Sequence, residues 1–342
     1  MKPPGVDSTR ASADRPDAAV VARVLFHDSP AAALALLAAD HEPVARSTAG
    51  QARAWLTGAA LGALGRFAAA EAVLRPLAGA EGGSYASLAC STLASHQRQL
   101  GRHADALAYD QRAEATIPAA KDPLSESARF DAELGLAADA VGLGRVDEAV
   151  ERLARADPGV PTNSVTDPVL AGWRRRVRHG WVATEIALLG GDPAAAVVLA
   201  ADALAEALAA KAPRHVAKSA LFLGASGYVR YRETSVAQSV RNGVADGRKA
   251  LDGGQETLEG ARSALTQAAS AAAALGALPL WWVAESLLAE VLALAGEPEA
   301  MIGGHRKSAA TVVTAIGAEL PVEQRSGWLS RPDLAVLLAA EQ

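Results

Sequence analysis

Two stretches near the middle of the chain carry positive charge and no acidic residue. Residues 168–184 contain a cluster of arginines, and residues 207–232 continue the excess with lysine and arginine. The nine cations are Arg174, Arg175, Arg176, Arg178, Lys211, Arg214, Lys218, Arg230 and Arg232. Because the whole chain has a net charge of −5, the remainder without these nine carries −14. An acidic protein with one basic zone has an electric field that attracts an anionic partner to that zone.

Aromatic residues interleave with these cations, and helical spacing brings both kinds onto one face. Arg178 and Trp181 are three residues apart, a spacing that places two side chains on the same face of a helix. In the second stretch, Lys218 is the first residue of a similar helical face. Arg178 and Lys218 can together hold a carboxylate through charge-assisted hydrogen bonds, with Trp181 as an apolar floor. The alternative is that the arginines lie in solvent and pair with nearby acids. The candidate partner-binding residues are Arg174, Arg175, Arg178, Trp181, Arg214, Lys218, Tyr228, Arg230 and Trp282.

A tryptophan pair is a second candidate feature. Neighbouring side chains on a helix point about 100° apart, so Trp281 and Trp282 cannot both face one core. We expect one to pack between helices and the other to face a groove or a neighbouring molecule. The alternative is that both are buried between successive helix pairs.

No catalytic or metal-binding pattern accompanies the basic zone. The sequence has no phosphate-binding glycine loop, nucleophile elbow, zinc-protease helix motif or paired-cysteine spacing. Its seven histidines are scattered, and we interpret His96, His103 and His215 as solvated or capping residues. Cys90, the single cysteine, stands among small apolar residues, which indicates a buried spacer in a reducing compartment. The sequence therefore predicts no enzymatic activity, no cofactor and no metal.

The elements that must position these residues are helices. Hydrophobic residues make up 50% of the chain and aromatic residues only 4%, so the strong helix formers alanine and leucine dominate. Three segments repeat one turn: LGRFAAAEAVL, LGRHADALAYD and LGRVDEAVERL. Each has an alanine five residues after its glycine, and later copies of the turn lie at Gly191 and Gly296. Glycine permits the left-handed backbone that ends one helix before the next begins.

These repeats resemble the tetratricopeptide repeat (TPR) family, in the irregular and partly lengthened form found in bacterial regulatory proteins. The resemblance is best over residues 45–157, and residues 88–118 make one helix–turn–helix unit. Successive turn glycines, at 65, 101, 144 and 191, are 36, 43 and 47 residues apart. The resemblance implies an all-α, right-handed superhelical solenoid of antiparallel helix pairs, with each first helix lining a concave groove. The matching residues are Trp55, Gly58, Gly65, Phe67, Ala70, Gly101, Ala106, Ala113, Pro118, Gly144, Ala149 and Ala156.

Composition divides the chain into three parts. Residues 1–17 are polar and proline-rich, which favours a disordered tail, and residues 18–316 form the repeat array. Residues 157–168 and 242–255 read as loops, and a sub-boundary of the array at 157–168 is one option. Residues 317–342 are expected to form a turn and a helix that caps the array, because the end of a solenoid needs cover.

The resemblance and the basic zone together predict a cytoplasmic scaffold or adaptor. Its concave groove would bind a partner protein through an acidic or carboxylate-bearing segment. One alternative is a regulatory module that senses a ligand or peptide, and another is a homo-oligomeric structural protein. The pI near 5.9 argues against nucleic acid as the partner, and no apolar run is long enough for membrane insertion.

Overall fold

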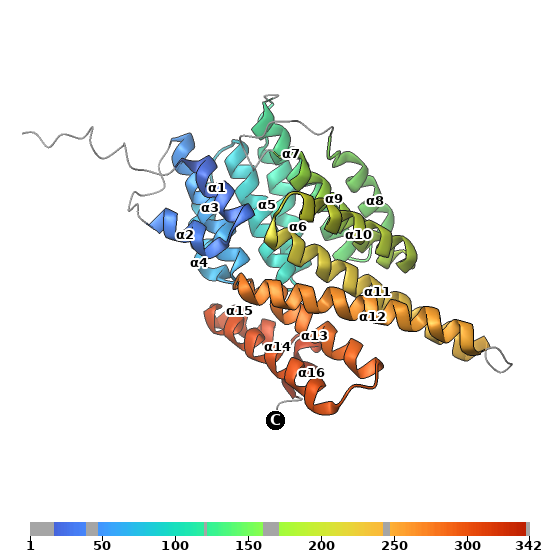
Figure 1. The fold of residues 1–342 in the computed structure, drawn as a ribbon. Coiled ribbons are helices and arrows are strands. Elements are labelled where there is room, and N and C mark those ends of the chain that lie inside the picture. Colours follow the sequence, from blue (N-terminus) through green and yellow to red (C-terminus); the bar gives the residue numbers. More distant parts are fainter. Residues whose placement is uncertain (1–16, 39–46, 120–121, 160–170, 242–246, 340–342) are drawn as a thin grey trace, which may run out of the picture.

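The computed structural model describes residues 17–38, 47–119, 122–159, 171–241 and 247–339, and over these ranges the chain forms α-helices and no strand (Figure 1). Within the same ranges, no helix is both long and apolar enough to cross a membrane. The helices are α1 Ala18–His27, α2 Pro30–Ala38, α3 Thr48–Ala63, α4 Phe67–Ala78, α5 Ser84–Gln99, α6 His103–Thr116, α7 Pro123–Gly142, α8 Val146–Arg155, α9 Gly172–Leu189, α10 Pro193–Ala209, α11 Pro213–Arg241, α12 Gly247–Ala274, α13 Leu278–Leu294, α14 Glu299–Glu319, α15 Val322–Leu329 and α16 Pro332–Ala339.

The helices stack as hairpins in two layers. From α3 to α14, each odd-numbered helix packs against the even-numbered helix that follows it and against the next odd-numbered helix. The odd-numbered helices α3, α5, α7, α9, α11 and α13 therefore form a continuous inner layer, and their partners form an outer layer. The chain is an all-α solenoid, as the sequence predicts.

Glycine turns join the two helices of most hairpins. Gly65, Gly101 and Gly144 have φ values of 80°, 76° and 72°, in the left-handed region. At the first of these turns the Arg66 N–H donates to the Leu61 carbonyl over 2.9 Å, the long-range bond of a Schellman motif. Lys211, with φ 52°, takes the glycine position between α10 and α11. That turn therefore lacks the glycine by which the other turns are recognised.

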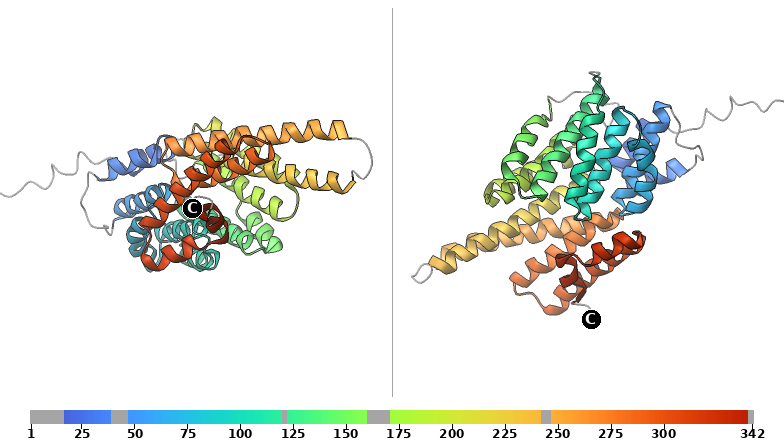
Figure 2. Two further views of the ribbon diagram at one scale, coloured as in Figure 1. Left: turned by 90° about the horizontal axis from the view of Figure 1, so that it is seen from below. Right: turned by 180° about the vertical axis from the view of Figure 1, so that it is seen from behind.

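The prediction of a loop over residues 242–255 is wrong for its second part, which is helical. The helix α12 begins at Gly247, while residues 242–246 lie outside the described ranges. A glycine inside a helix costs only about 1 kcal/mol, and the long packing contact between α11 and α12 offsets such a cost. The far ends of α11 and α12 extend beyond the rest of the molecule (Figures 1 and 2).

The C-terminal helices pack back onto the first hairpins. A buried apolar cluster joins Phe67 and Leu100 to residues of α14 and α16, including Val313 and Leu334. The Arg331 guanidinium also donates to the Gln99 carbonyl oxygen over 3.3 Å. Near the other end of the chain, α1 packs against α11. Both ends of the chain thus contact distant repeats, and the array curves back on itself.

Three aromatic residues of the first helices lie in the core together with Cys90, whose burial confirms the prediction from the sequence. Phe26, Trp55, Phe67 and Cys90 are all buried. The region after residue 316 differs from the expected single helix, because α14 continues to Glu319 and two short helices follow. Trp328, on the first of these, is buried and donates its indole N–H to the Val313 carbonyl over 3.1 Å. Its ring belongs to a buried apolar cluster that also contains Val313 and Ile316 of α14.

Trp328→Ala should destabilise the protein by about 3 kcal/mol or more, since truncation of a buried tryptophan leaves a cavity and removes the indole hydrogen bond to Val313. Val322→Ala on the same helix is the matched control, because Val322 is 73% exposed and Trp328 is 2% exposed. Urea-induced unfolding followed by circular dichroism gives both values. Equal midpoints for the two variants would show that α15 does not contribute to the core.

Candidate binding site

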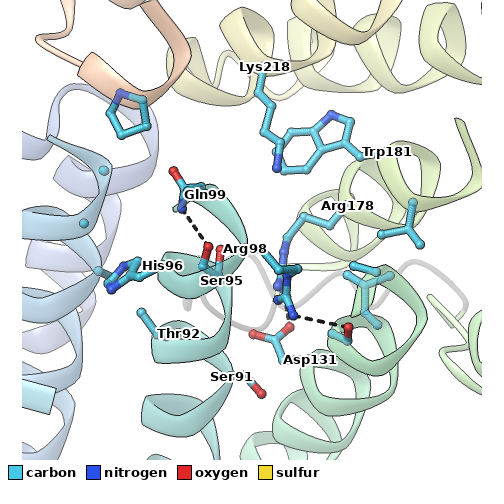
Figure 3. Close-up of a pocket in the computed structure, with 18 of the residues that line it drawn as sticks. Ser91, Thr92, Ser95, His96, Arg98, Gln99, Asp131, Arg178, Trp181 and Lys218 are labelled. Atoms are coloured by element: carbon cyan, nitrogen blue, oxygen red, sulfur yellow. Dashed lines mark hydrogen bonds and ion pairs between the residues drawn. The ribbon is translucent and has the colours of Figure 1, made fainter. Parts of the chain in front are cut away.

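The inner helices surround a central cavity of about 390 Å³ (Figure 3). Its wall includes residues of α1, α3, α5, α7, α9, α11 and α13, so both ends of the array contribute. Leu25 and Phe26 come from α1, and Leu280 and Val283 come from α13. A volume in this range suits a small ligand or a short segment of a larger one.

Helical spacing explains which polar residues reach the cavity. On α9 the wall residues Arg174, Arg178, Trp181 and Glu185 follow one another at intervals of four, three and four residues, which is one face of the helix. On α11 they are Arg214, Lys218 and Leu221, and on α5 they are Ser91, Ser95 and Arg98. The inner faces of α5, α9 and α11 therefore supply cations and hydroxyl groups to one cavity.

Two arginines of α9 share a single carboxylate. Arg178 forms a short ion pair with Asp131 of α7, and the Arg174 guanidinium lies 3.5 Å from the same carboxylate. Burial alone would raise the pKa of Asp131, but the adjacent Arg178 and Arg174 hold it below its ordinary value. Burial, reinforced by repulsion from Arg178, lowers the pKa of Arg174 to about 10. One of the two positive charges therefore has no anion of its own.

Arg214 of α11 has no acidic partner among the described residues. Its Nε atom is buried and makes no hydrogen bond. Burial, together with repulsion from Arg178, lowers the pKa of its guanidinium to about 10. The side chain keeps some accessible surface because it borders the cavity. This guanidinium is thus held in place with hydrogen-bonding capacity to spare.

Lys218, one helical turn along α11, lies over aromatic rings. Its Nζ atom is 4.4 Å from the centre of the Trp181 ring and 5.5 Å from that of Phe222 (Figure 3). Trp181 is fixed in turn by a 2.8 Å hydrogen bond from its indole N–H to the Ser219 hydroxyl. Burial and the nearby arginines lower the pKa of Lys218 to about 8, although Glu185 opposes the shift.

His215 lies among these cations as a neutral ring. It stacks on Trp181 at 5.4 Å and meets Trp173 and Phe26 edge-on at 4.9 and 6.0 Å. Burial and then the surrounding cations lower its pKa well below the ordinary value. His215 and His96 are both buried, so the expectation that they are solvated or capping residues is wrong. For His96 the space comes from Gly62, where a Cβ would lie 1.8 Å from the ring nitrogen.

Arg98 on α5 has its own pair of acids. Its Nη1 atom lies 2.5 Å from an Asp110 oxygen and 2.7 Å from an Asp139 oxygen. Both carboxylates are fully buried. Burial raises the pKa of Asp110 to about 8; Arg98 acts to lower this pKa, and the neighbouring Asp139 acts to raise it. Arg98 is therefore electrically compensated, whereas Arg174 shares its carboxylate with Arg178, and Arg214 has no acidic partner among the described residues.

Five of the nine candidate residues border the cavity: Arg174, Arg178, Trp181, Arg214 and Lys218. The structure does not bring the other four there. Arg175 donates a hydrogen bond to the Ser127 hydroxyl, and Arg230 is exposed. Tyr228 packs against the apolar cluster between α11 and α12. Trp282 packs edge-on against Trp328, 6.0 Å away, and Trp281 is also partly buried between helices.

Sequence reasoning missed Asp131, although a signal for it exists. Asp131 stands 13 residues before the turn glycine Gly144, and Arg178 stands 13 residues before Gly191. The two residues thus occupy equivalent positions in successive repeats, which places them side by side on adjacent inner helices. Aligning the repeats on their turns would have shown that the acid missing from the sequence around Arg178 is supplied by α7. The described residues contain no group of three potential ligands that could hold a metal ion.

Asp131→Asn should destabilise the protein by about 3 kcal/mol at pH 7, because it leaves Arg174 and Arg178 facing each other without an anion. The folded-state pKa of Asp131 is depressed, so its stabilising effect is present above the unfolded pKa of about 3.9 and is lost as the pH falls through the folded value. Urea unfolding at pH 7 and at pH 3 measures both effects. Asp105→Asn, at an exposed ion pair, is the control; an equal loss there would contradict the assignment.

No protein-family model matches this chain, and no curated protein matches it. Among solved structures, the crystal structure of a Rap protein complexed with competence and sporulation factor is similar, with a TM-score of 0.42 and 12% sequence identity. The match covers 94% of this chain and 96% of that chain. The assignment of an all-α solenoid rests on the helices of this chain and their contacts.

Proposed function

We propose that this protein binds an anionic segment of a partner protein or peptide in its central cavity, as a TPR-like scaffold. The observation that carries the proposal is the unequal number of charges on the cavity wall. Arg174 and Arg178 share one carboxylate, and Arg214 has none among the described residues. Buried charges without partners cost free energy, so a site that retains them favours an anion from outside.

The geometry is suited to a carboxylate at the end of a chain or on an acidic side chain. Arg178 and Arg214 offer planar guanidinium groups, which bind carboxylates through two parallel hydrogen bonds. Lys218 adds a compact charge beside them, and Trp181 supplies the flat apolar surface under it. These side chains belong to helices that are already packed, so little ordering is required on binding.

The position of the cavity between both ends of the array favours a second candidate, a regulatory module that responds to a bound ligand or peptide. Residues of α1 and α13 border the same space as the basic wall. A ligand in contact with Arg214 would therefore lie close to both ends of the array and stabilise their association. Slower amide hydrogen exchange in α1 and α13 after ligand binding would favour this candidate over a simple scaffold.

Arg214→Met should raise the stability of the unliganded protein while weakening anion binding. The variant removes a buried, unpaired charge and keeps most of the side-chain volume, so we expect a gain of about 1 kcal/mol in urea unfolding. Loss of one charge-assisted contact should weaken binding about tenfold or more. Calorimetry with acetyl-Ala-Phe as the free acid and as its amide measures the second effect.

Arg230→Met is the matched control, because Arg230 lies on the same helix and is exposed. It should bind the free acid as the natural protein does. Equal affinity of the natural protein for the acid and the amide, or an Arg214→Met variant that binds normally, would sink this placement of the site.

A further inference from the structure

The cavity wall carries two positive charges more than its own acids balance. Its described cations, apart from the compensated Arg98, are Arg174, Arg178, Arg214 and Lys218. Its acids are Asp131 and Glu185. Burial raises the pKa of Glu185, whereas the positive charges of Lys218 and Arg98 act to lower it. This carboxyl group therefore cancels at most one positive charge. The three histidines of the wall do not change the count, because burial lowers the pKa values of His96, His103 and His215.

The uncompensated cations lie close together. Arg174 lies 5.2 Å from the centre of the Phe26 ring and Lys218 lies 4.4 Å from that of Trp181, and both rings contact the His215 ring, at 6.0 and 5.4 Å. The cations come from adjacent inner helices, α9 and α11, and Arg178 and Arg214 repel each other directly. A group that balanced them would need its negative charges on neighbouring atoms.

Hydrogen-bond donors remain open at the same place. The Nε atoms of Arg174 and Arg214 are buried and have no hydrogen-bond partner, although the Nη2 atom of Arg174 lies 3.5 Å from an Asp131 oxygen. The Ser91 hydroxyl, on the opposite α5 wall, is also buried without a partner. An Arg Nε–H group can only donate a hydrogen bond, so each of the two Nε atoms needs an acceptor such as an oxygen atom as its partner.

Another part of the cavity wall is apolar. Phe26, Trp55, Leu221, Leu280 and Val283 border it, together with the ring of Trp181. A bare inorganic anion would fill only a part of about 390 Å³ and leave these side chains without contact. The wall therefore suits a ligand with a charged end and an apolar body.

We propose that the ligand carries two negative charges on one compact group, a phosphate monoester or two adjacent carboxylates, attached to an apolar body. This inference rests on the proposed function and deepens it, because it distinguishes a doubly charged group from the single carboxylate of a chain terminus. Two charges match the surplus on α9 and α11, and their oxygens match the open Nε donors.

Three small aromatic probes separate the possibilities, because they share one ring and differ in charge. Benzoate carries one negative charge, whereas phthalate carries two adjacent carboxylates and phenyl phosphate carries a phosphate monoester. Calorimetry at pH 7.5 and constant ionic strength should show both dianions binding at least tenfold more tightly than benzoate. Arg214→Met should reduce the affinity for the dianions and bring it close to that for benzoate, while Arg230→Met should leave all three affinities unchanged.

The outcomes distinguish this inference from the proposed function. Benzoate binding as tightly as both dianions would overturn the charge assignment and leave anion binding intact. Failure of all three probes, with the free acid of acetyl-Ala-Phe still bound, would also overturn the charge assignment alone. If the protein does not bind the free acid either, this result also contradicts the proposed function. Preference for only one of the dianions supports the inference and identifies which group the site takes.

Discussion

Close approach of the helices is the constraint on which the cavity depends. Alanine and glycine at the helix contacts leave room for larger polar side chains from neighbouring helices. At Gly135 on α7, a Cβ would lie 2.2 Å from an Asp110 oxygen, so only glycine allows this buried carboxylate to reach Arg98. Asp110 can thus compensate Arg98 only because residue 135, on the neighbouring helix α7, has no side chain. Without such contacts, the polar wall of the cavity would have no fixed geometry.

The cavity wall combines compensated and uncompensated charge in a defined pattern. The carboxylates of α6 and α7 satisfy Arg98, and Asp131 satisfies part of the α9 pair. Burial, reinforced by cationic neighbours, lowers the pKa values of Arg214 and Lys218 on α11. Such an arrangement lowers the stability of the empty protein and strengthens the attraction for an anion. The most strained electrostatic position in the fold is therefore also its best candidate for recognition.

Much of the fold could be predicted from the sequence, because glycine turns and alanine-rich faces are local signals. The same signals failed where the chain departs from them. Lys211 takes a glycine position, and the glycines after Gly247 lie inside a helix that long-range packing stabilises. For the site, helical spacing placed Arg178, Trp181 and Lys218 on inner faces, whereas the pairing of Arg178 with Asp131 and the burial of His215 depend on contacts between repeats. Those contacts have no local sequence pattern.

The contact between Arg331 and Gln99 joins residues that are 232 positions apart. An open solenoid can gain or lose a repeat during evolution, because each unit touches only its neighbours. In this chain an added hairpin would move the C-terminal helices away from Phe67 and Leu100, and a lost hairpin would drive them into the inner layer. The number of repeats is therefore fixed by closure. Variation among descendants of this fold should accumulate as substitutions on the cavity wall and in the projecting ends of α11 and α12, and the repeat count should stay constant.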